Sequence, residues 1–256
     1  MKLGKVETYI HQTIERDGVV FFGLIDPTND KGKDPVELAK VFDEANADII
    51  LIGGSTGVEG DSFNETMKTI KESVSKPIML FPGNVGGVSR YADALYFMSL
   101  LNSKNPYWIT GAHAIAAPMI VKMGIEAIPT SLLIVEPGQT VGRVGEAKLI
   151  PYDKPDIAVS YALAGKLMGH RITILERGSG APGPSSPETF RAVKKAVQHP
   201  VICAGSSRTL DDIRNTVKAG ADGIHIASLI EKSESPLQTA KRLVEFTKKV
   251  GKEKRE

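Results

Sequence analysis

Short apolar segments alternate with helical segments along almost the whole chain. Helical patterns separate nearly all of the apolar segments, which favours parallel strands joined by crossover helices. Eight such units in a chain of 256 residues predict one TIM (β/α)8 barrel domain spanning residues 1–256. The segments with the composition of buried strands cover approximately 19–27, 47–57, 77–84, 92–99, 126–138, 171–176, 200–207 and 221–228.

One of the predicted connections is too short for a standard barrel. Between Phe81 and Ala92 the chain reads PGNVGGVSRY, which is rich in glycine and shorter than a crossover helix. We therefore expect a modified barrel whose third helix is missing or replaced by a short Gly-rich segment. The competing architecture is a doubly wound open sheet, but no GxGxxG motif opens the first βα unit.

Composition narrows the class of protein. The formal net charge is +2, which argues against a nucleic-acid partner. Cys203 lies in the apolar run PVICAG and is expected to be a buried core residue, with no disulfide within the chain. No signal-peptide pattern and no apolar run near 18 residues is present, so we expect a cytoplasmic protein. The basic tail KKVGKEKRE is expected to be a frayed, solvated helix end.

Residues 170–181, HRITILERGSGA, carry the clearest functional signal. A β-branched run ends in Glu176, and the loop Gly178-Ser179-Gly180 follows. Active sites of TIM barrels lie at the carboxyl ends of the strands, and glycines let backbone N–H groups approach a phosphate. The alternative is an ordinary βα turn with a solvated glutamate.

Other strand ends carry acids and small hydroxyl residues. Asp26 follows the first strand and is suited to Mg²⁺, although Asp-Pro also forms ordinary turns. Ser55 and Thr56 follow the second strand, where they could contact metal or phosphate or simply form a tight turn. Gly205-Ser206-Ser207 and Ala227-Ser228 follow strands seven and eight, the usual phosphate site of this fold.

The sequence does not assign a function to three further features. His225 lies inside the eighth strand and alternates with Ile224 and Ile226, so it faces the other side of the sheet; its role stays open. His113 lies in an apolar helical stretch and is expected to be a packing histidine. Loop 137–154, with Arg143 and Lys148, fits either a mobile lid over a diphosphate or a solvated loop.

The strand ends belong to longer blocks that resemble one enzyme family, the geranylgeranylglyceryl phosphate synthases, which are grouped with the bacterial heptaprenylglyceryl phosphate synthases. The resemblance covers about residues 19–235. The blocks that carry it are LIDP (24–27), ADIILIGGSTG (47–57), PIMLFPGN (77–84), ADALYFMSLLNSKNPYWITGA (92–112), VEPGQTVGRVGEAKLIP (135–151), YALAGKLMG (161–169) and LERGSGA (175–181).

The resemblance implies a prenyltransferase of archaeal membrane-lipid synthesis on a TIM barrel that lacks its third helix. It would join geranylgeranyl diphosphate to the 3-hydroxyl of sn-glycerol 1-phosphate with Mg²⁺ and release diphosphate. Asp26 and Ser55 would hold the metal, Glu176 would hold the glycerol hydroxyls and accept the proton, and bulky Trp108 would limit the prenyl length to twenty carbons. The glycerol phosphate site would comprise Ile174, Leu175, Glu176, Arg177, Gly178, Ser179, Gly180, Gly205, Ser206, Ala227 and Ser228.

Several residues depart from the family pattern, mostly in the phosphate pocket. Ile174 replaces a tyrosine, Arg177 a small residue and Ser206 a glycine, and Ala227-Ser228 replace Gly-Asn. Phosphate binding through N–H groups and serine hydroxyls remains the expectation, with added charge from Arg177. A lipid product is compatible with peripheral membrane contact and requires no transmembrane segment. A single sequence does not determine the oligomeric state.

Other function classes share parts of this pattern. A sugar-phosphate isomerase or lyase would use the same phosphate site, but it needs a lysine or histidine acid–base pair at the strand ends. A non-catalytic phosphate-binding barrel is supported only by the altered phosphate-site residues. A flavin oxidoreductase could also use such a phosphate site. A purified flavoprotein is yellow, so a colourless protein would exclude this class.

Overall fold

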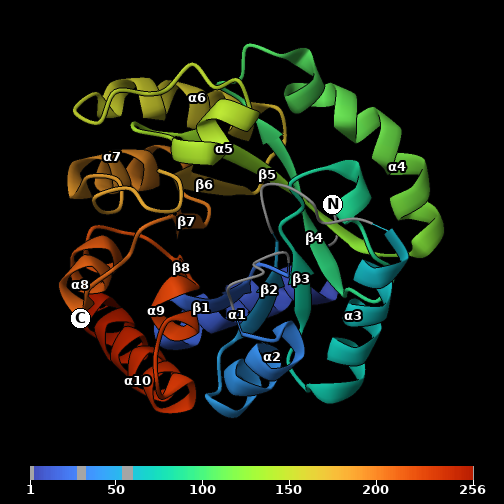
Figure 1. Ribbon diagram of the computed structural model, residues 1–256. Helices are drawn as coiled ribbons and strands as arrows, with labels where there is room; N and C mark the ends of the chain where they lie inside the picture. The colour runs from blue at the N-terminus through green and yellow to red at the C-terminus, as the bar shows by residue number, and fades with distance from the viewer. Residues whose placement is uncertain (1–2, 28–32, 54–59, 256) are drawn as a thin grey trace.

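Eight parallel strands close into a barrel in sequence order (Figure 1). Closure occurs where β8 pairs with β1, with Phe22 beside His225. The computed structural model describes residues 3–27, 33–53 and 60–255. The strands are β1 (Val20–Ile25), β2 (Ile49–Ile52), β3 (Ile78–Leu80), β4 (Ala94–Leu100), β5 (Glu126–Ile134), β6 (Ile172–Glu176), β7 (Val201–Ala204) and β8 (Gly223–Ile226).

Helices surround the barrel, and each predicted strand is present, including the ambiguous segment 92–99 as β4. Strands such as β2 are buried on both faces because one face lies in the barrel interior and the other contacts helices. The helices are α1 (Lys5–Asp17), α2 (Pro35–Glu44), α3 (Gly60–Ser73), α4 (Ala112–Met123), α5 (Gln139–Val144), α6 (Pro155–Leu167), α7 (Pro187–Val197), α8 (Leu210–Lys218), α9 (Ser228–Glu231) and α10 (Pro236–Arg255).

The connection from β3 to β4 confirms the prediction of a missing helix. Only a single 3-10 turn, η1 (Val85–Gly87), lies between these strands, where a standard barrel has a full crossover helix. Asn84 caps this turn, because its side-chain oxygen accepts a hydrogen bond from the N–H of Val85 at 2.7 Å. The outer ring of helices is therefore interrupted between α3 and α4.

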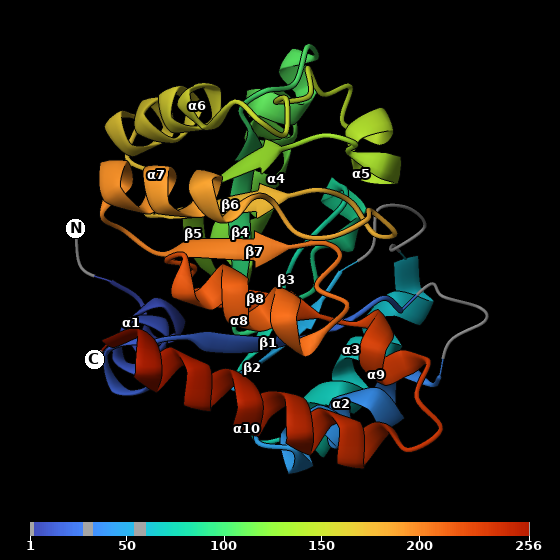
Figure 2. The same cartoon turned by 90° about the vertical axis from the view of Figure 1, so that its left-hand side faces the viewer.

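Helix α1 closes the amino-terminal end of the barrel (Figure 2). Its Val6 and Ile10 are buried among the inward-facing side chains of the strands. Glu7 on the same helix is fully buried, and its carboxylate accepts a hydrogen bond from the Nε of Arg171 at 2.6 Å. The barrel is thus filled at this end, and the carboxyl end of the strands is left as the open mouth.

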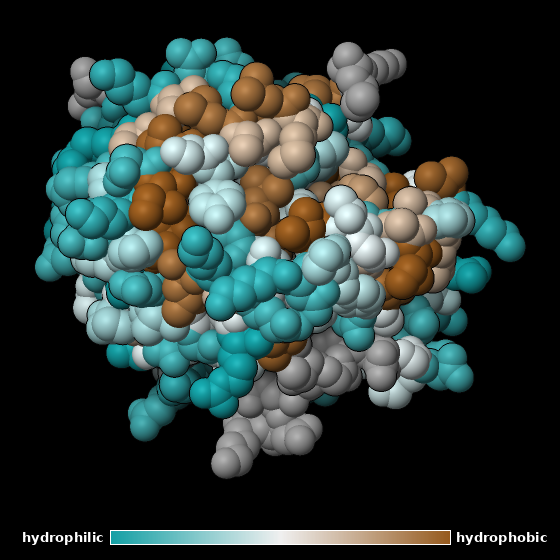
Figure 3. All heavy atoms as spheres, turned by 90° about the horizontal axis from the view of Figure 1, so that it is seen from above, coloured by the Kyte–Doolittle hydropathy of each residue, from teal (hydrophilic) through white to brown (hydrophobic). Residues whose placement is uncertain are grey.

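Helices α4 and α6 carry most of the large exposed apolar side chains. Figure 3 views the molecule from the side of these helices, where apolar and polar side chains are interspersed. Ile115 and Val121 on α4, and Leu163 and Leu167 on α6, are exposed. Across the described ranges, every helix falls short of the combined length and apolarity of a membrane span.

The basic tail is packed against the barrel, which corrects the expectation of a frayed end. Helix α10 continues to Arg255, and Lys254 donates a hydrogen bond to the carbonyl of Ala221 at 3.0 Å. A methyl group added to Gly18 would lie 2.0 Å from the carbonyl oxygen of Gly251, so two glycines allow the close approach of this helix. Backbone contact, not charge alone, fixes the tail.

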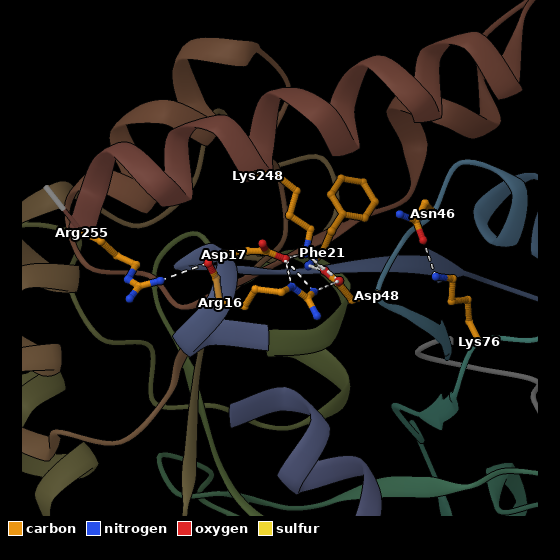
Figure 4. Close-up of polar contacts among 8 residues, drawn as sticks. All are labelled: Arg16, Asp17, Phe21, Asn46, Asp48, Lys76, Lys248 and Arg255. Atoms are coloured by element: carbon orange, nitrogen blue, oxygen red, sulfur yellow. Dashed lines mark hydrogen bonds and ion pairs between the residues drawn. The ribbon is translucent and has the colours of Figure 1, made fainter. Parts of the chain in front are cut away.

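A buried ionic cluster attaches α10 to the amino-terminal end of the barrel (Figure 4). The ammonium group of Lys248 lies 2.9 Å from a carboxylate oxygen of Asp17 and 2.6 Å from one of Asp48. Asp48 also accepts a hydrogen bond from the N–H of Phe21 at 2.7 Å. Burial alone would raise the pKa of Asp17, but hydrogen bonds from Arg16 and Lys248 lower it overall.

We predict that Lys248→Met lowers the free energy of unfolding by about 2–4 kcal/mol near pH 7, because two buried carboxylates lose their shared cation. The loss should shrink as the pH falls below about 4, since a carboxyl group whose pKa is depressed contributes stability only while it is ionised. Urea unfolding across this pH range measures both effects.

The matched control is Lys241→Met on the same helix. Lys241 pairs with Glu44 at 3.0 Å, but the two side chains are 45% and 63% exposed. This change should cost less than about 1 kcal/mol. An equal loss in both variants would contradict the assigned role of the buried cluster.

Candidate active site

A cavity of about 330 Å³ opens at the carboxyl end of the barrel strands. Its lining comes from residues that are far apart in sequence and adjoin here because parallel strands end at the same edge. The polar part of the lining includes Asp26, Asn84, Thr140, Glu176, Ser179, Ser206, Ser207, His225, Ser228 and Glu231. The structure therefore brings the predicted acids and the predicted phosphate-site serines into one cavity.

Glu176 ends β6 and is only 6% exposed. Its Oε1 accepts a hydrogen bond from the N–H of Gly178 at 2.5 Å. Burial raises the pKa of Glu176 to about 7, while the N–H groups of Gly178 and Arg177 hold it lower than burial alone would. A carboxylate with this pKa can exchange a proton near neutral pH.

Gly205 is required by the close packing of the loops after β6 and β7. Its φ is +75°, and an added methyl group would lie 2.2 Å from the Oε1 of Glu176. Such a side chain would displace the carboxylate from its hydrogen bond with Gly178. Glycine at this position therefore keeps the acid in place.

The loops after β7 and β8 form the polar rim of the cavity. Ser206 has a φ of +63°, and its hydroxyl donates a hydrogen bond to the carbonyl of Gly178 at 2.9 Å. Ser207 and Ser228 line the cavity beside it, and Ala227 precedes the short helix α9. TIM barrels commonly bind phosphate at this position, through the loops after strands seven and eight and a short extra helix.

The side chain of Arg177 does not line the cavity, which corrects the expectation that it adds charge to the phosphate pocket. Its guanidinium donates to the carbonyls of Glu136 at 2.6 Å and Gly183 at 2.7 Å. The same group lies 4.4 Å from the ring centroid of Tyr152. Arg177 instead connects the segment that follows β5 with the loop that follows β6, because its partners belong to these two segments and are absent from the described cavity lining.

Two other predicted substrate-site residues are core residues. Ile174 packs in the barrel interior, and Leu175 packs between the barrel and its helices. Alternation along β6 places Glu176 on the same inner side as Ile174. The side chains of these two apolar residues therefore support the position of Glu176 and do not line the cavity.

Acidic residues at the cavity mouth fit a divalent cation. Asp26 lines the cavity directly after β1, and Glu231 on α9 lines it as well. The described residues hold no group of three or more metal-binding side chains. Mg²⁺ needs only one or two protein carboxylates when phosphate oxygens complete its coordination, so the donor set fits this ion. Ser55, the other predicted metal residue, lies outside the described residues, as does Thr56.

The cavity extends into an apolar groove at the place of the missing crossover helix. Leu95 and Phe97 on the outer side of β4 face Ala116 and Ile120 of α4. The lining is completed on this side by Val85, Val88 and His113. Hydrophobic lining of this kind suits an apolar chain.

His113 packs in this groove, as expected from the sequence. Its ring meets Phe97 edge-to-face at a centroid distance of 4.6 Å. Burial lowers the pKa of His113, so the imidazole is neutral in this apolar setting.

Trp108 lies in a π-helical turn, η2 (Tyr107–Gly111), directly before α4. It lines the cavity together with Val141 and Val144 of α5. The indole packs against the inner hydrophobic cluster and lies 4.9 Å from the ring of Tyr107. A bulky side chain therefore stands at one wall of the apolar part of the cavity.

Segment 137–154 contains a short helix and is held in place by hydrogen bonds. Helix α5 was not anticipated, because the sequence there is rich in glycine. Asn102 is 1% exposed, and its amide donates to the carbonyls of Ile134 and Lys148, each at 2.9 Å. Arg143 and Lys148 are exposed, whereas the valines of α5 face the cavity. The segment supplies an apolar wall, which differs from the cationic lid considered above.

Sequence reasoning assigned no role to Glu231, Tyr96 or His225, which line the cavity. Glu231 lies on the short helix α9, which is too brief to give a periodic signal. Tyr96 and His225 lie inside strands, and the hydroxyl of Tyr96 is 3.1 Å from Nε2 of His225. Alternation along β8 indicated the direction of His225, but no local pattern identifies its partner on β4.

Comparison with known proteins gives consistent matches along the chain. The sequence profile of the PcrB family matches residues 11–247. The chain is 49% identical over 250 residues to the geranylgeranylglyceryl phosphate synthase of Thermococcus kodakarensis, covering 98% of this chain and 99% of that protein. The corresponding protein of Pyrococcus furiosus is 49% identical over 252 residues, covering 98% and 100%.

A solved structure matches the whole barrel. It is (S)-3-O-geranylgeranylglyceryl phosphate synthase from Thermoplasma acidophilum in complex with its substrate sn-glycerol-1-phosphate. The TM-score is 0.88 at 37% identity, and the match covers 97% of this chain and 100% of that chain. The similarity therefore includes every strand end that contributes to the cavity.

The raised pKa of Glu176 predicts a cost to stability. From its ordinary pKa of 4.5 up to about 7, the native state binds more protons than the unfolded state, so stability falls as the pH rises through this range. Glu176→Gln removes this effect. We expect the variant to be more stable than the parent at pH 8, by on the order of 3 kcal/mol, and to match it below pH 4.

Urea unfolding at pH 4, 6 and 8 measures this difference. Glu65→Gln, on the exposed face of α3, is the control and should change stability by less than about 0.5 kcal/mol at each pH. A Glu176→Gln variant that is less stable than the parent at pH 8 would refute the raised pKa.

Proposed function

The chain belongs to the PcrB family, and from that membership we propose that it is a prenyltransferase acting on sn-glycerol 1-phosphate. The reaction forms an ether bond between the 3-hydroxyl of the glycerol phosphate and geranylgeranyl diphosphate, and diphosphate is released. It is the step that forms the first ether bond of archaeal membrane phospholipids.

This proposal rests on the kinds of residue that line one cavity. A polar mouth with acids and serines is continuous with an apolar groove between β4 and α4. A small phosphorylated alcohol requires the first part, and a long hydrocarbon chain requires the second. The isomerase or lyase alternative would need a lysine or histidine acid–base pair at the strand ends. The described lining includes no lysine, and its two histidines lie elsewhere, His113 on α4 against Phe97 and His225 inside β8.

Glu176 is the proposed base. The oxygen of the 3-hydroxyl forms a bond with the first carbon of the prenyl chain, while the bond from that carbon to the diphosphate breaks and its electron pair leaves with the diphosphate. The hydroxyl proton passes to the carboxylate of Glu176, whose pKa of about 7 suits this transfer. The N–H of Gly178 keeps the carboxylate oriented.

The proposed phosphate site lies at the rim of the cavity. Gly205, Ser206, Ala227 and Ser228 follow β7 and β8, and all four line the cavity. Ser207 lies beside them and extends the predicted set, and Gly178, Ser179 and Gly180 follow β6. The hydroxyl of Ser206 is engaged with the carbonyl of Gly178, so backbone N–H groups are the more available donors. The serine departs from the family's glycine and joins two loops of the site.

The proposed metal is Mg²⁺, held by Asp26 together with Ser55. When bound, this ion would stabilise the negative charge on the departing diphosphate. Asp26 directly follows β1, which pairs with β8 in the closed barrel, so it adjoins the proposed phosphate side of the cavity. Glu231 supplies a second carboxylate at the same mouth.

The prenyl chain is proposed to occupy the apolar groove, with Trp108 limiting its length. The absent crossover helix leaves this side of the barrel open to a hydrocarbon, and α4 covers it with small and aliphatic side chains. The indole of Trp108 occupies volume in the same cavity. A side chain of this size favours the twenty-carbon donor over longer ones.

The direct test is incubation of the purified protein with Mg²⁺, sn-glycerol 1-phosphate and prenyl diphosphates of several lengths, with products read by mass. An ether product mainly from the twenty-carbon donor is expected. The absence of an ether product with every donor would refute the proposed function.

Asp26→Asn tests the metal proposal. Replacing the carboxylate with a neutral amide should lower kcat by on the order of 100-fold and raise the Mg²⁺ concentration needed for half-maximal rate. Asp34→Asn is the matched control, because Asp34 caps α2 through Val36 N and Glu37 N and asparagine caps equally well. An unchanged Mg²⁺ dependence in Asp26→Asn would exclude Asp26 as a metal ligand.

Trp108→Ala tests the length limit. Removing the indole enlarges the cavity, so the preferred donor should shift from twenty carbons to a longer prenyl diphosphate, measured as the ratio of kcat/KM values. Trp108→Phe retains much of the ring and should keep the parent's preference. If the alanine variant still prefers the twenty-carbon donor, another residue sets the length.

A further inference from the structure

The loop that follows β7 is bonded to the loop that follows Glu176. The hydroxyl of Ser206 donates a hydrogen bond to the carbonyl of Gly178 at 2.9 Å. Two residues further along, a guanidinium nitrogen of Arg208 donates to the carbonyl of Gly180 at 3.1 Å. Ser206 makes the inner of these two contacts, because it lines the cavity, whereas Arg208 is exposed and absent from the described lining.

Gly178 transmits this contact to Glu176. Its N–H donates to Oε1 of the Glu176 carboxylate at 2.5 Å, while its carbonyl accepts from Ser206. The same carbonyl accepts a hydrogen bond from the N–H of Ala181 at 3.2 Å. Gly178 has a φ of +87° and no side chain to restrict it, so these hydrogen bonds limit the rotation of a residue that is otherwise flexible.

The backbone of Ser206 has a conformation that costs energy. Its φ is +63°, in the left-handed region that glycine adopts freely and a residue with a Cβ atom adopts at a cost. Such residues persist where surrounding contacts hold them, and they cluster at functional sites. The preceding Gly205 has a φ of +75°, so two consecutive left-handed residues turn the chain and bring the hydroxyl of Ser206 to the carbonyl of Gly178.

The same turn lies directly against the carboxylate. A methyl group added to Gly205 would lie 2.2 Å from Oε1 of Glu176 and 2.9 Å from the backbone nitrogen of Gly178. The loop after β7 therefore contacts both the acid and the N–H group that orients it. Ser206 contributes the side-chain hydrogen bond of this contact.

We propose that Ser206 is a positioning residue for Glu176, because its hydroxyl fixes Gly178, whose N–H holds the carboxylate at the cavity. This inference rests on the proposed function, in which Glu176 accepts the proton of the glycerol hydroxyl. The hydroxyl of Ser206 acts through Gly178 and does not bind the phosphate. Its one proton is already donated to a carbonyl, and the phosphate oxygens are themselves acceptors.

The proposed contact has a consequence for the protonation of Glu176. Burial raises the pKa of Glu176 to about 7, and the N–H groups of Gly178 and Arg177 oppose this increase. Without the hydroxyl of Ser206, Gly178 is less restricted and its hydrogen bond to the carboxylate weakens. The pKa of Glu176 should therefore rise further, because the ionised form loses part of its stabilisation.

Other titratable groups lie on the elements around Glu176. Burial raises the pKa of Cys203 on β7 to about 12, so this thiol is neutral. The guanidinium of Arg177 is bonded to the carbonyl of Glu136. The other titratable side chains of the described cavity lining are Asp26, Tyr96, His113, His225 and Glu231. Ser206→Ala changes none of these groups and keeps a Cβ atom at the left-handed position, so the comparison isolates the hydroxyl.

Carbon-13 NMR of the glutamate carboxyl groups measures the pKa of Glu176 without substrates, and Glu176→Gln assigns its signal. In the parent protein this group should titrate near pH 7. In Ser206→Ala its pKa should be higher by about one pH unit, as expected for the weakening of one hydrogen bond to the carboxylate. An unchanged pKa would overturn the proposal.

Ser206→Gly keeps the test available if the alanine variant does not fold. It also removes the hydroxyl, and glycine adopts the left-handed conformation without cost. The pKa of Glu176 should rise in this variant as well. A pKa equal to that of the parent in Ser206→Gly would likewise overturn the proposal.

Steady-state kinetics distinguish positioning of the base from binding of phosphate. Ser206→Ala should lower kcat at pH 7 by about tenfold, while the KM of sn-glycerol 1-phosphate stays within about twofold of the parent value. A higher KM with an unchanged kcat would assign the hydroxyl to the phosphate and contradict the positioning role.

Ser160→Ala is the matched control. The hydroxyl of Ser160 also donates to a backbone carbonyl, that of Asp156, at 2.9 Å, but it lies on the exposed side of α6. This variant should keep the parent's pKa for Glu176 and the parent's kinetic constants. An increase in that pKa equal to the one in Ser206→Ala would show that the effect is not specific to the contact with Gly178.

The NMR titration separates this inference from the proposed function. If the parent protein forms no ether product with any donor, the proposed function fails. The titration requires no substrate, so it still decides whether Ser206 controls the carboxylate of Glu176.

Discussion

Closure of the parallel sheet is the constraint on which the rest of the structure depends. The pairing of β8 with β1 brings Asp26 and Ser228 to one mouth, although they lie at opposite ends of the chain. Helix α1 fills the other end of the barrel, and the Lys248 cluster attaches the final helix there. The chain therefore has stabilising contacts at one end of the strands and a cavity at the other, as is usual for this fold.

The missing crossover helix and the phosphate-side loops lie on opposite sides of this closed sheet. The apolar groove adjoins β4, while the serine-rich rim follows β7 and β8. Two substrates of opposite character can then approach from different sides and meet above the barrel interior. Glu176 lies between them, in a position dry enough to raise its pKa. Burial of this carboxyl group costs stability, and the proposed reaction transfers a proton at this residue.

Residues that depart from the family pattern acquire structural roles in the loops. Arg177 donates to backbone carbonyls and stacks on Tyr152, and Ser206 joins the loop after β7 to the loop after β6. The sequence predicted that these residues lie near the strand ends, and they do. It could not predict their direction, because the acceptors belong to loops that come close only after the barrel closes. Helices α5 and α9 were missed because both are too short for a periodic pattern, and α5 also lies in a glycine-rich stretch.

The sequence by itself determined the barrel, its missing helix and the acids at the strand ends, because strand composition, helical periodicity and loop length are local properties. The family resemblance could likewise be identified from contiguous blocks of sequence. Tertiary structure alone decided which side chains share the cavity. The pairing of Tyr96 with His225, the hydrogen bond from Ser206 to Gly178 and the contact between Gly205 and Glu176 each join different strands or loops. Their geometry depends on barrel register, which no single segment of the chain encodes.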